Sequence, residues 1–234
     1  MDPLDGRERG VVVTSHDDAV VEPQVCPPRK CVPRQVHQSA TMACVTHRTT
    51  NELEAALDIL RGSPSDSGTI ELVVRRPAVG ERELLDEAEL SREAGLVGDT
   101  WRDRGSRHTP DGSAETNRQL TVMNARAIAL FAGEDRARWA EAGDQLFVDI
   151  NLSDVNLPAG TRLQLGSAVI EITAEPHNGC AKFAARFGQD AARFVNSPAG
   201  KELHLRGINA LVVQAGRLRR GDVALKLMDV TSSS

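Results

Sequence analysis

Aromatic residues are scarce in this chain. Of its 234 residues, 5 are Phe and 2 are Trp, and Tyr is absent. The interior of the folded part must therefore be built mainly from Val, Leu, Ile and Ala, which bury less surface per side chain than aromatic residues do. The length suffices for one substantial domain with an appendage, or for two small domains.

Long apolar runs are missing too, and none approaches the roughly 20 residues that a membrane-spanning helix needs. The N-terminus lacks a charged segment followed by an apolar one, so we expect a cytoplasmic location and no membrane association. The 4 cysteines are too few and too unevenly placed for a secreted disulfide scaffold.

The charge of the chain gives no basis for nucleic-acid binding, because the formal net charge is −5. The arginine-rich pieces at 102–107 and 217–220 are local, and either could hold an anionic cofactor or simply face solvent. Glycine fingerprints of dinucleotide-binding and P-loop sites are absent, as are the His-Glu-x-x-His and Gly-x-Ser-x-Gly motifs. These absences exclude several common classes of enzyme.

Residues 1–48 differ from the rest, since they hold several prolines and show no sustained periodicity. We predict a flexible N-terminal extension or a non-native leader there, followed by one domain over 49–230. A zinc site is the alternative for the extension, formed by Cys26, Cys31, His37 and Cys44. Only the Cys26–Cys31 spacing comes near a zinc template, and Cys44 has no close partner.

The domain carries short strand-like runs, closely spaced turn signals and a few small helices. Helices are predicted from a capping box of Asn51 with Glu54 up to Gly62, and over 125–132 with Asn124 as its cap. Two more are predicted over 134–142 and 189–195. The strands are predicted at 69–74, 82–88, 119–123, 146–150, 163–165, 168–173, 207–214 and 223–227. This pattern predicts a mainly β fold with inserted short helices, a β-barrel or sandwich rather than a parallel α/β sheet.

One stretch stands out for its chemistry, Pro-His-Asn-Gly-Cys-Ala-Lys-Phe-Ala-Ala-Arg-Phe-Gly at 176–188. It follows a predicted strand, makes a turn and then begins a helix, with Asn178 as the expected N-cap and Cys180 in the first turn. The helix dipole, with His177 and Lys182 nearby, would favour the thiolate, the form that binds soft metals or attacks electrophiles.

A structural role for Cys180 is the competing interpretation. Together with Phe183, Ala184 and Phe187 it has the spacing of one helix face. A free cysteine is often a small buried apolar residue, so Cys180 could simply be packed in the core.

Three other segments carry candidate binding residues. Arg75 and Arg76 at a strand end could bind an anion together or lie exposed. The polar stretch from Asp99 through Arg102 to Asn117 could be a mobile surface loop or a lid over the Cys180 pocket. Asn151 could contact a polar ligand edge or start a turn.

Several motifs occur together in an order that resembles the MOSC domain, named after the C-terminal part of molybdenum-cofactor sulfurase, in its small stand-alone bacterial type. The resemblance covers roughly 69–227. It rests on Val74-Arg75-Arg76-Pro77, Gly95-Leu96-Val97-Gly98-Asp99, Gln119-Leu120-Thr121-Val122-Met123, Asp149-Ile150-Asn151-Leu152, Gly160-x-x-Leu163-x-Leu165-Gly166, Pro176-His177-Asn178-Gly179-Cys180 and Gly221-Asp222. The family's usual Pro-Cys is replaced here by Gly179-Cys180, and Thr100-Trp101 follows Asp99 where Arg-His is common.

The resemblance implies a β-barrel in which Cys180 either ligates molybdenum or carries sulfur. Related members reduce N-hydroxylated compounds on the molybdenum cofactor (molybdopterin), and pyridoxal phosphate binding is associated with the family as a whole. Cys180 and His177 are then the catalytic candidates, His177 as a proton donor or alternatively as a turn residue. The cofactor-binding candidates are Arg75, Arg76, Asp99, Arg102, Asn151, Asn178 and Lys182. Arg104 is a further candidate for donating hydrogen bonds to the phosphate of the cofactor.

These expectations define a leading hypothesis, an oxidoreductase that uses the molybdenum cofactor to reduce a small-molecule substrate. No flavin, haem or iron–sulfur motif is present, so a redox partner protein would supply the electrons; a homodimer is a possible assembly. The alternatives are a sulfur-carrier or cofactor-binding module without reductase activity, and a non-enzymatic barrel.

Overall fold

The structure, a computed structural model, describes residues 47–228. Nearly all of the predicted extension over 1–48 lies outside the described residues, and so do Cys26, Cys31, His37 and Cys44 of the zinc hypothesis. In the part that is described, no helix is both long and apolar enough to cross a bilayer.

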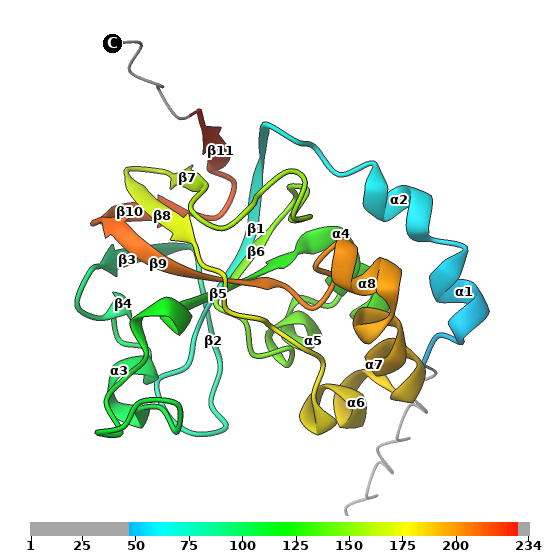
Figure 1. The fold of residues 1–234 in the computed structure, drawn as a ribbon, viewed down its shortest axis with the longest axis horizontal. Coiled ribbons are helices and arrows are strands. Elements are labelled where there is room, and N and C mark those ends of the chain that lie inside the picture. The colour runs from blue at the N-terminus through cyan, green and yellow to red at the C-terminus, as the bar shows by residue number, and fades with distance from the viewer. Residues whose placement is uncertain (1–46, 229–234) are drawn as a thin grey trace, which may run out of the picture. The chain divides into compact units, whose positions relative to one another are not determined.

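Seven strands close into a barrel (Figure 1). Around the barrel they follow the order β1-β11-β7-β8-β9-β5-β6, and β6 pairs again with β1. Only β5 and β6 are parallel; the other neighbours are antiparallel. The strands are β1 (Ser67–Arg75), β5 (Leu120–Asn124), β6 (Leu146–Val148), β7 (Arg162–Leu165), β8 (Ala168–Ile172), β9 (Ile208–Gln214) and β11 (Val223–Leu227). The predicted barrel with short helices is therefore confirmed.

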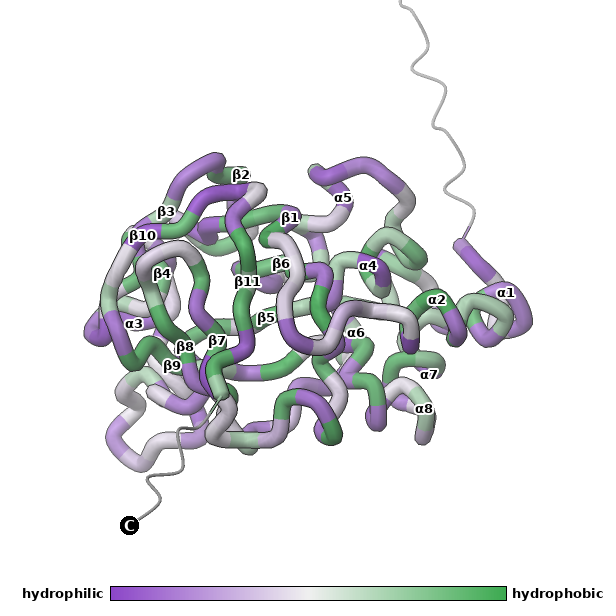
Figure 2. Tube along the Cα trace, turned by 90° about the horizontal axis from the view of Figure 1, so that it is seen from above, coloured by the Kyte–Doolittle hydropathy of each residue, from purple (hydrophilic) through white to green (hydrophobic). Residues whose placement is uncertain are grey.

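The remaining strands extend this barrel at one side. β2 (Glu83–Leu85) pairs with the second half of β1, beyond the residues that β11 occupies. A small separate sheet is formed by β10 (Gly216–Arg219), β3 (Glu87–Ser91) and β4 (Gly95–Leu96). Barrel strands such as β8 and β9 are largely hydrophobic, whereas β3 and β10 of the small sheet carry more hydrophilic residues (Figure 2).

Several strands bury side chains on both faces, because the barrel is filled inside and covered by helices outside. In β1, Ile70 and Val73 belong to the barrel interior, whereas Leu72 and Val74 belong to a second hydrophobic cluster beneath the helices. From Leu72 to Val74 the side chains alternate between the two faces. The irregularity in the pairing with β6 between Ile70 and Leu72 places these two residues, two positions apart, on opposite faces. The cluster under the helices holds most of the few aromatic residues, including Phe131, Phe147, Phe183, Phe187 and Phe194.

The helices gather on one side of the barrel, apart from α3 (Trp101–Arg104) and a 3-10 turn at Thr116–Arg118 (Figure 1). They are α1 (Thr50–Glu54), α2 (Leu57–Arg61), α4 (Ala125–Ala132), α5 (Arg136–Ala140), α6 (Ala181–Phe187), α7 (Gln189–Asn196) and α8 (Pro198–Glu202). The longest have 8 residues. Such short helices depend on tertiary packing, which the second cluster supplies.

The expected elements agree with the structure where local signals are strong. Helix α4 is capped by Asn124 as predicted, and β7 and β8 form the predicted hairpin. The first capping box was misassigned: Thr49 and Glu52 form it, because Thr49 has the extended conformation of an N-cap while Asn51 already lies inside α1. Helices α3 and α8 and strands β4 and β10 were not predicted.

Asn124 joins the barrel to the helices, and its loss should destabilise the protein. Its Oδ1 accepts from Ala127 N at 3.0 Å, and its Nδ2 donates to Ile150 O at 2.7 Å and to Ser63 Oγ at 3.0 Å. Asn124→Ala removes a cap and leaves buried partners unsatisfied, so we expect a loss of about 2–4 kcal/mol in the free energy of unfolding by urea titration. Asp135→Ala, at the exposed cap of α5, should cost only about 1 kcal/mol. Equal losses in the two variants would contradict a special role for Asn124.

Candidate functional site

Cys180 lies in the loop that connects β8 to α6. It is itself the N-cap of α6, with φ −114° and ψ 174°, and its carbonyl accepts from Ala184 N at 3.0 Å. The predicted cap, Asn178, lies two residues too early, and Cys180 precedes the first turn instead of lying in it. At the cap position Cys180 directly precedes the first turn, whose amides have no partner within the helix.

The thiol is exposed, so the interpretation of Cys180 as a packed core residue is wrong. The apolar face of α6 consists of Phe183 and Phe187 and does not include the cysteine. Both rings are buried, and Phe183 packs against Phe131 and against Phe187. These two rings anchor α6 to the hydrophobic cluster. The anchoring leaves the N-terminal end of the helix, with its cysteine, at the surface of a cavity.

The pKa of the Cys180 thiol is lower than that of an ordinary cysteine. Partial burial raises this pKa, but the backbone amides of Phe183 and Lys182 and the positive charge of Arg206 outweigh it. The thiolate is the form that binds metals and attacks electrophiles. The geometry therefore favours the reactive state of this sulfur.

Basic side chains surround this thiol in a cavity of about 350 Å³. Phe183, Ala142, Gly143 and Thr100 contribute to its wall, and Ala78–Gly80 and Arg82 come from the β1–β2 connection. Six of the lining residues carry a positive charge: Arg76, Arg82, Arg104, Lys182, Arg186 and Arg206. Among the described residues that line the cavity there is no Asp or Glu.

Two of these arginines are held by buried carboxylates. Arg76 donates through Nε to Asp99 Oδ2 at 2.8 Å and through Nη2 to Oδ1 at 2.7 Å, and its Nη1 donates to Gly143 O at 3.0 Å. Arg206 donates to Asp144 Oδ2 at 2.6 Å and to Ala142 O at 3.0 Å. Both carboxylates are inaccessible to solvent. Asp99, predicted to bind the cofactor, is thus committed to Arg76 and to the amide of Trp101.

The other four cations, Arg82, Arg104, Lys182 and Arg186, form no ion pair with any described carboxylate. Arg82 donates to the carbonyl oxygens of Ala140 and Glu81, and Arg186 to that of Glu141. Partial burial, and then the charge of Arg76, lower the pKa of the Arg82 and Arg104 guanidinium groups. Like charges held this close repel one another, so an anion in the cavity would relieve the repulsion.

Several predicted binding residues lie away from this cavity. Arg75 pairs with Glu83 at 2.6 Å and does not line it, because consecutive residues of a strand point to opposite faces. Arg102 is exposed and is not part of the cavity wall either, although Arg104 of the same helix is. Asn151 accepts from Ser153 N at 3.0 Å, the contact of a turn residue. Asn178 lines a different cavity.

His177 also faces that neighbouring cavity, of about 350 Å³. Its Nδ1 lies 3.5 Å from Asp144 Oδ1. Burial and the charge of Arg206 lower the pKa of His177 to about 4, although Asp144 acts in the opposite direction. The imidazole is therefore neutral near pH 7, which does not suit a proton donor.

Some residues of the site were not predicted from the sequence. Arg82, Arg186 and Arg206 line the cavity, and Asp144 holds Arg206. Each belongs to a different segment, and Arg82, Asp144 and Arg206 lie in none of the motifs. Only Arg186 could have been predicted from its spacing, because it follows Lys182 by four residues, about one helical turn, and therefore lies on the same face of the helix.

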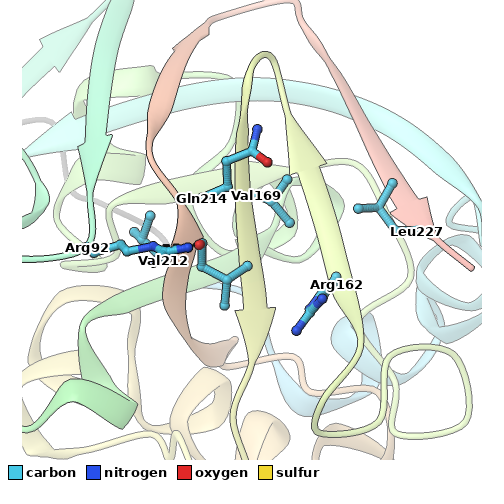
Figure 3. A pocket seen from close by; sticks show the side chains of 7 residues that line it. Arg92, Arg162, Val169, Val212, Gln214 and Leu227 are labelled. Atoms are coloured by element: carbon cyan, nitrogen blue, oxygen red, sulfur yellow. Dashed lines mark hydrogen bonds between the residues drawn. The ribbon is translucent and has the colours of Figure 1, made fainter. Parts of the chain in front are cut away.

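Two further hollows are less promising. One, of about 620 Å³, is lined by residues of β7, β8, β9 and β11 and by Arg92 (Figure 3). Its two arginines are engaged, Arg92 with Val213 O at 2.7 Å and Arg162 with Glu171 at 3.0 Å. A shallow groove along α6 and α7 reaches Cys180 from another direction, lined partly by Ala181, Ala184 and Ala185. Within residues 47–228, no cluster of three or more His, Cys, Asp or Glu could hold a metal ion by itself.

Comparison with solved structures supports the fold. The YuaD protein from Bacillus subtilis matches with a TM-score of 0.50 and 16% identity, over 69% of this chain and 97% of that one. A second match, described only as a hypothetical protein, has a TM-score of 0.50 and 20% identity, over 74% of this chain and 73% of the other. At such identities the likeness concerns architecture alone. No protein-family model and no curated protein sequence matches the chain.

Anion binding in the basic cavity can be tested with Arg104→Gln, because this side chain lines the cavity and makes no hydrogen bond to any residue in the range 47–228. Inorganic pyrophosphate should raise the melting temperature of the wild type, by an amount that corresponds to about 2.7 kcal/mol at a hundred times its Kd. The variant should need severalfold more pyrophosphate for the same gain. Arg107→Gln, an exposed neighbour outside the cavity, should behave like the wild type. No stabilisation by pyrophosphate would contradict the anion site.

The buried state of His177 predicts a pH dependence of stability. Because burial lowers the pKa of His177 from 6.5 to about 4, the unfolded chain takes up a proton between these values while the folded chain does not. This histidine should therefore cost about 2 kcal/mol of unfolding free energy between pH 7 and pH 5. Urea titrations should show a smaller loss over that interval for His177→Gln, and an unchanged loss for the exposed His108→Gln. A wild-type pH dependence in His177→Gln would refute this assignment.

Proposed function

We propose that this protein is a MOSC-type protein that holds a molybdenum cofactor through Cys180 and reduces small N-hydroxylated compounds. The observation that carries the proposal is the exposed thiol of lowered pKa in a cavity lined by six cations. The family assignment comes from the sequence motifs. The barrel shared with YuaD agrees in architecture.

The residues present fit such a cofactor. Thiolate is a soft ligand suited to a transition metal. The phosphate of the pterin needs donors with positive charge, and the four cations without carboxylate partners supply them: Arg82, Arg104, Lys182 and Arg186. The cavity wall offers no carboxylate that would repel an anion. When bound, the cofactor would supply the two-electron chemistry.

The chain's own residues would bind, orient and stabilise charge. The helix amides lower the pKa of the Cys180 thiol, and Asp99 fixes the guanidinium of Arg76 in one orientation through two hydrogen bonds. Asp144 holds Arg206 through one hydrogen bond, from Nη1 to Oδ2, and Arg206 packs over the Phe183 ring at 5.1 Å. Groups fixed in advance need little reorganisation when an anionic ligand arrives. A redox partner protein would supply the electrons, since the sequence shows no second redox motif.

A sulfur carrier is the second candidate. Here the Cys180 thiolate would attack the sulfane sulfur of a donor persulfide, so that a new S–S bond forms at Sγ while the donor's S–S bond breaks and its thiolate leaves. An exposed cysteine of lowered pKa suits this step. The shallow groove that also reaches Cys180 would give a donor access from outside the basic cavity.

Metal analysis separates these proposals. Purified from a host that makes the cofactor, the wild-type protein should contain close to one molybdenum per chain, and Cys180→Ser should lose most of it. Cys44→Ser serves as the matched control and should retain the metal.

Intact-mass measurement of the same samples addresses the alternative. A mass gain of one sulfur atom at Cys180, without molybdenum, would replace the reductase by the sulfur carrier. Neither metal nor sulfur adduct under these conditions would overturn both.

A further inference from the structure

The loop that presents Cys180 has no regular structure, and side chains from other segments hold it at its start. Arg118 donates to Pro176 O at 3.1 Å and pairs with Glu175 at 2.9 Å. Asn209 Nδ2 donates to Glu175 O at 3.0 Å. These contacts hold the start of the loop, but they end before the cysteine.

The residue before the cysteine, Gly179, is held by one side chain on both of its backbone groups. Gly179 N donates to Asn196 Oδ1 at 3.1 Å, and Asn196 Nδ2 donates to Gly179 O at 3.1 Å. A carboxamide carries one donor group and one acceptor, so it can pair with a backbone residue much as a neighbouring strand would. No other side chain is hydrogen-bonded to the backbone of Gly179 in the described part of the chain.

Asn196 is itself well fixed. It is the last residue of α7, and its Nδ2 also donates to Ala192 O at 2.9 Å one turn earlier. All of its side-chain hydrogen-bonding groups are therefore engaged. Buried Phe194 and Val195 fasten the same end of α7 to the hydrophobic cluster.

The contact between the loop and α7 is close enough to require glycine. A Cβ on Gly179 would lie 2.7 Å from Val195 Cγ2 and 3.0 Å from Asn196 Nδ2. Any larger residue would push the loop away from α7. Gly179 and Asn196 thus form one device, which we call the Gly179–Asn196 clamp.

We propose that Asn196 is the positioning residue of Cys180: the clamp fixes the peptide before the cysteine and so holds the sulfur at the N-cap of α6, beside the basic cavity. The importance of this role for metal binding or sulfur transfer rests on the proposed function. Asn196 lies in the shallow groove and does not line the basic cavity, so it acts only through the loop.

The test is the pH dependence of the alkylation of Cys180 by iodoacetamide in metal-free protein, followed by peptide mass so that the other cysteines do not interfere. The wild type should show a thiol pKa below the usual 8.5 or so. In Asn196→Ala the sulfur is no longer held against the helix amides, so its pKa should rise and the alkylation rate at pH 6.5 should fall about tenfold. Gly179→Ala should have the same effect, whereas Gln189→Ala, an exposed amide on the same helix, should match the wild type.

A purely structural role for Asn196 would lower the melting temperature without moving the thiol pKa, and that result would overturn the proposal. Hydrogen exchange on the wild type gives a second test that needs no variant. The Gly179 amide should be protected well above the amide of Asn178, and equal exchange of the two would equally overturn the clamp. Because both tests use metal-free protein, they hold or fail independently of the molybdenum analysis.

Discussion

Closure of the barrel is the constraint on which the rest of the structure depends. Ser67–Thr69 of β1 pairs with Val223–Leu225 of β11, which joins the first strand of the domain to its last. On its other edge β1 pairs with β6, and its second half pairs with β2. The closed barrel leaves no free edge along most of its strands. Its inner face forms one apolar core, and its outer face supports the helices that carry the cysteine.

The candidate site lies where these two layers meet. Arg76 follows β1, Asp144 precedes β6, Arg206 precedes β9 and Cys180 follows β8, so one region of the barrel receives groups from four strands. The buried carboxylates Asp99 and Asp144 each fix one arginine, and the remaining cations are left without ion pairs. These cations gather around one cavity although the formal net charge of the chain is −5, and an anion bound there would relieve their mutual repulsion. This contrast between the cavity and the whole chain is the strongest physical support for an anionic ligand.

Local signals allowed much of the fold to be predicted. The β7–β8 hairpin follows from alternating residues around Gly166-Ser167, and α4 from Asn124 before an apolar helix face. Helix α8 was missed although Ser197-Pro198 has the form of a cap followed by proline at the first helical position. Strand β10 could not be recognised, because Gly216–Arg219 has a single buried apolar residue, Leu218, and is extended only through its pairing with β3.

The sequence by itself determined that a cysteine stands at a strand-to-helix corner with Lys182 beside it, since turn residues, periodicity and capping are properties of neighbours along the chain. Only the tertiary structure decided which charges meet the sulfur. It turned Arg76 toward the cavity and Arg75 away, assigned Asp99 to a supporting role, set His177 beside Asp144, and brought Arg82, Arg186 and Arg206 together. The physical reason is that strand register and barrel closure set the distances between remote segments, and a shift of one residue would reverse the face that every side chain occupies.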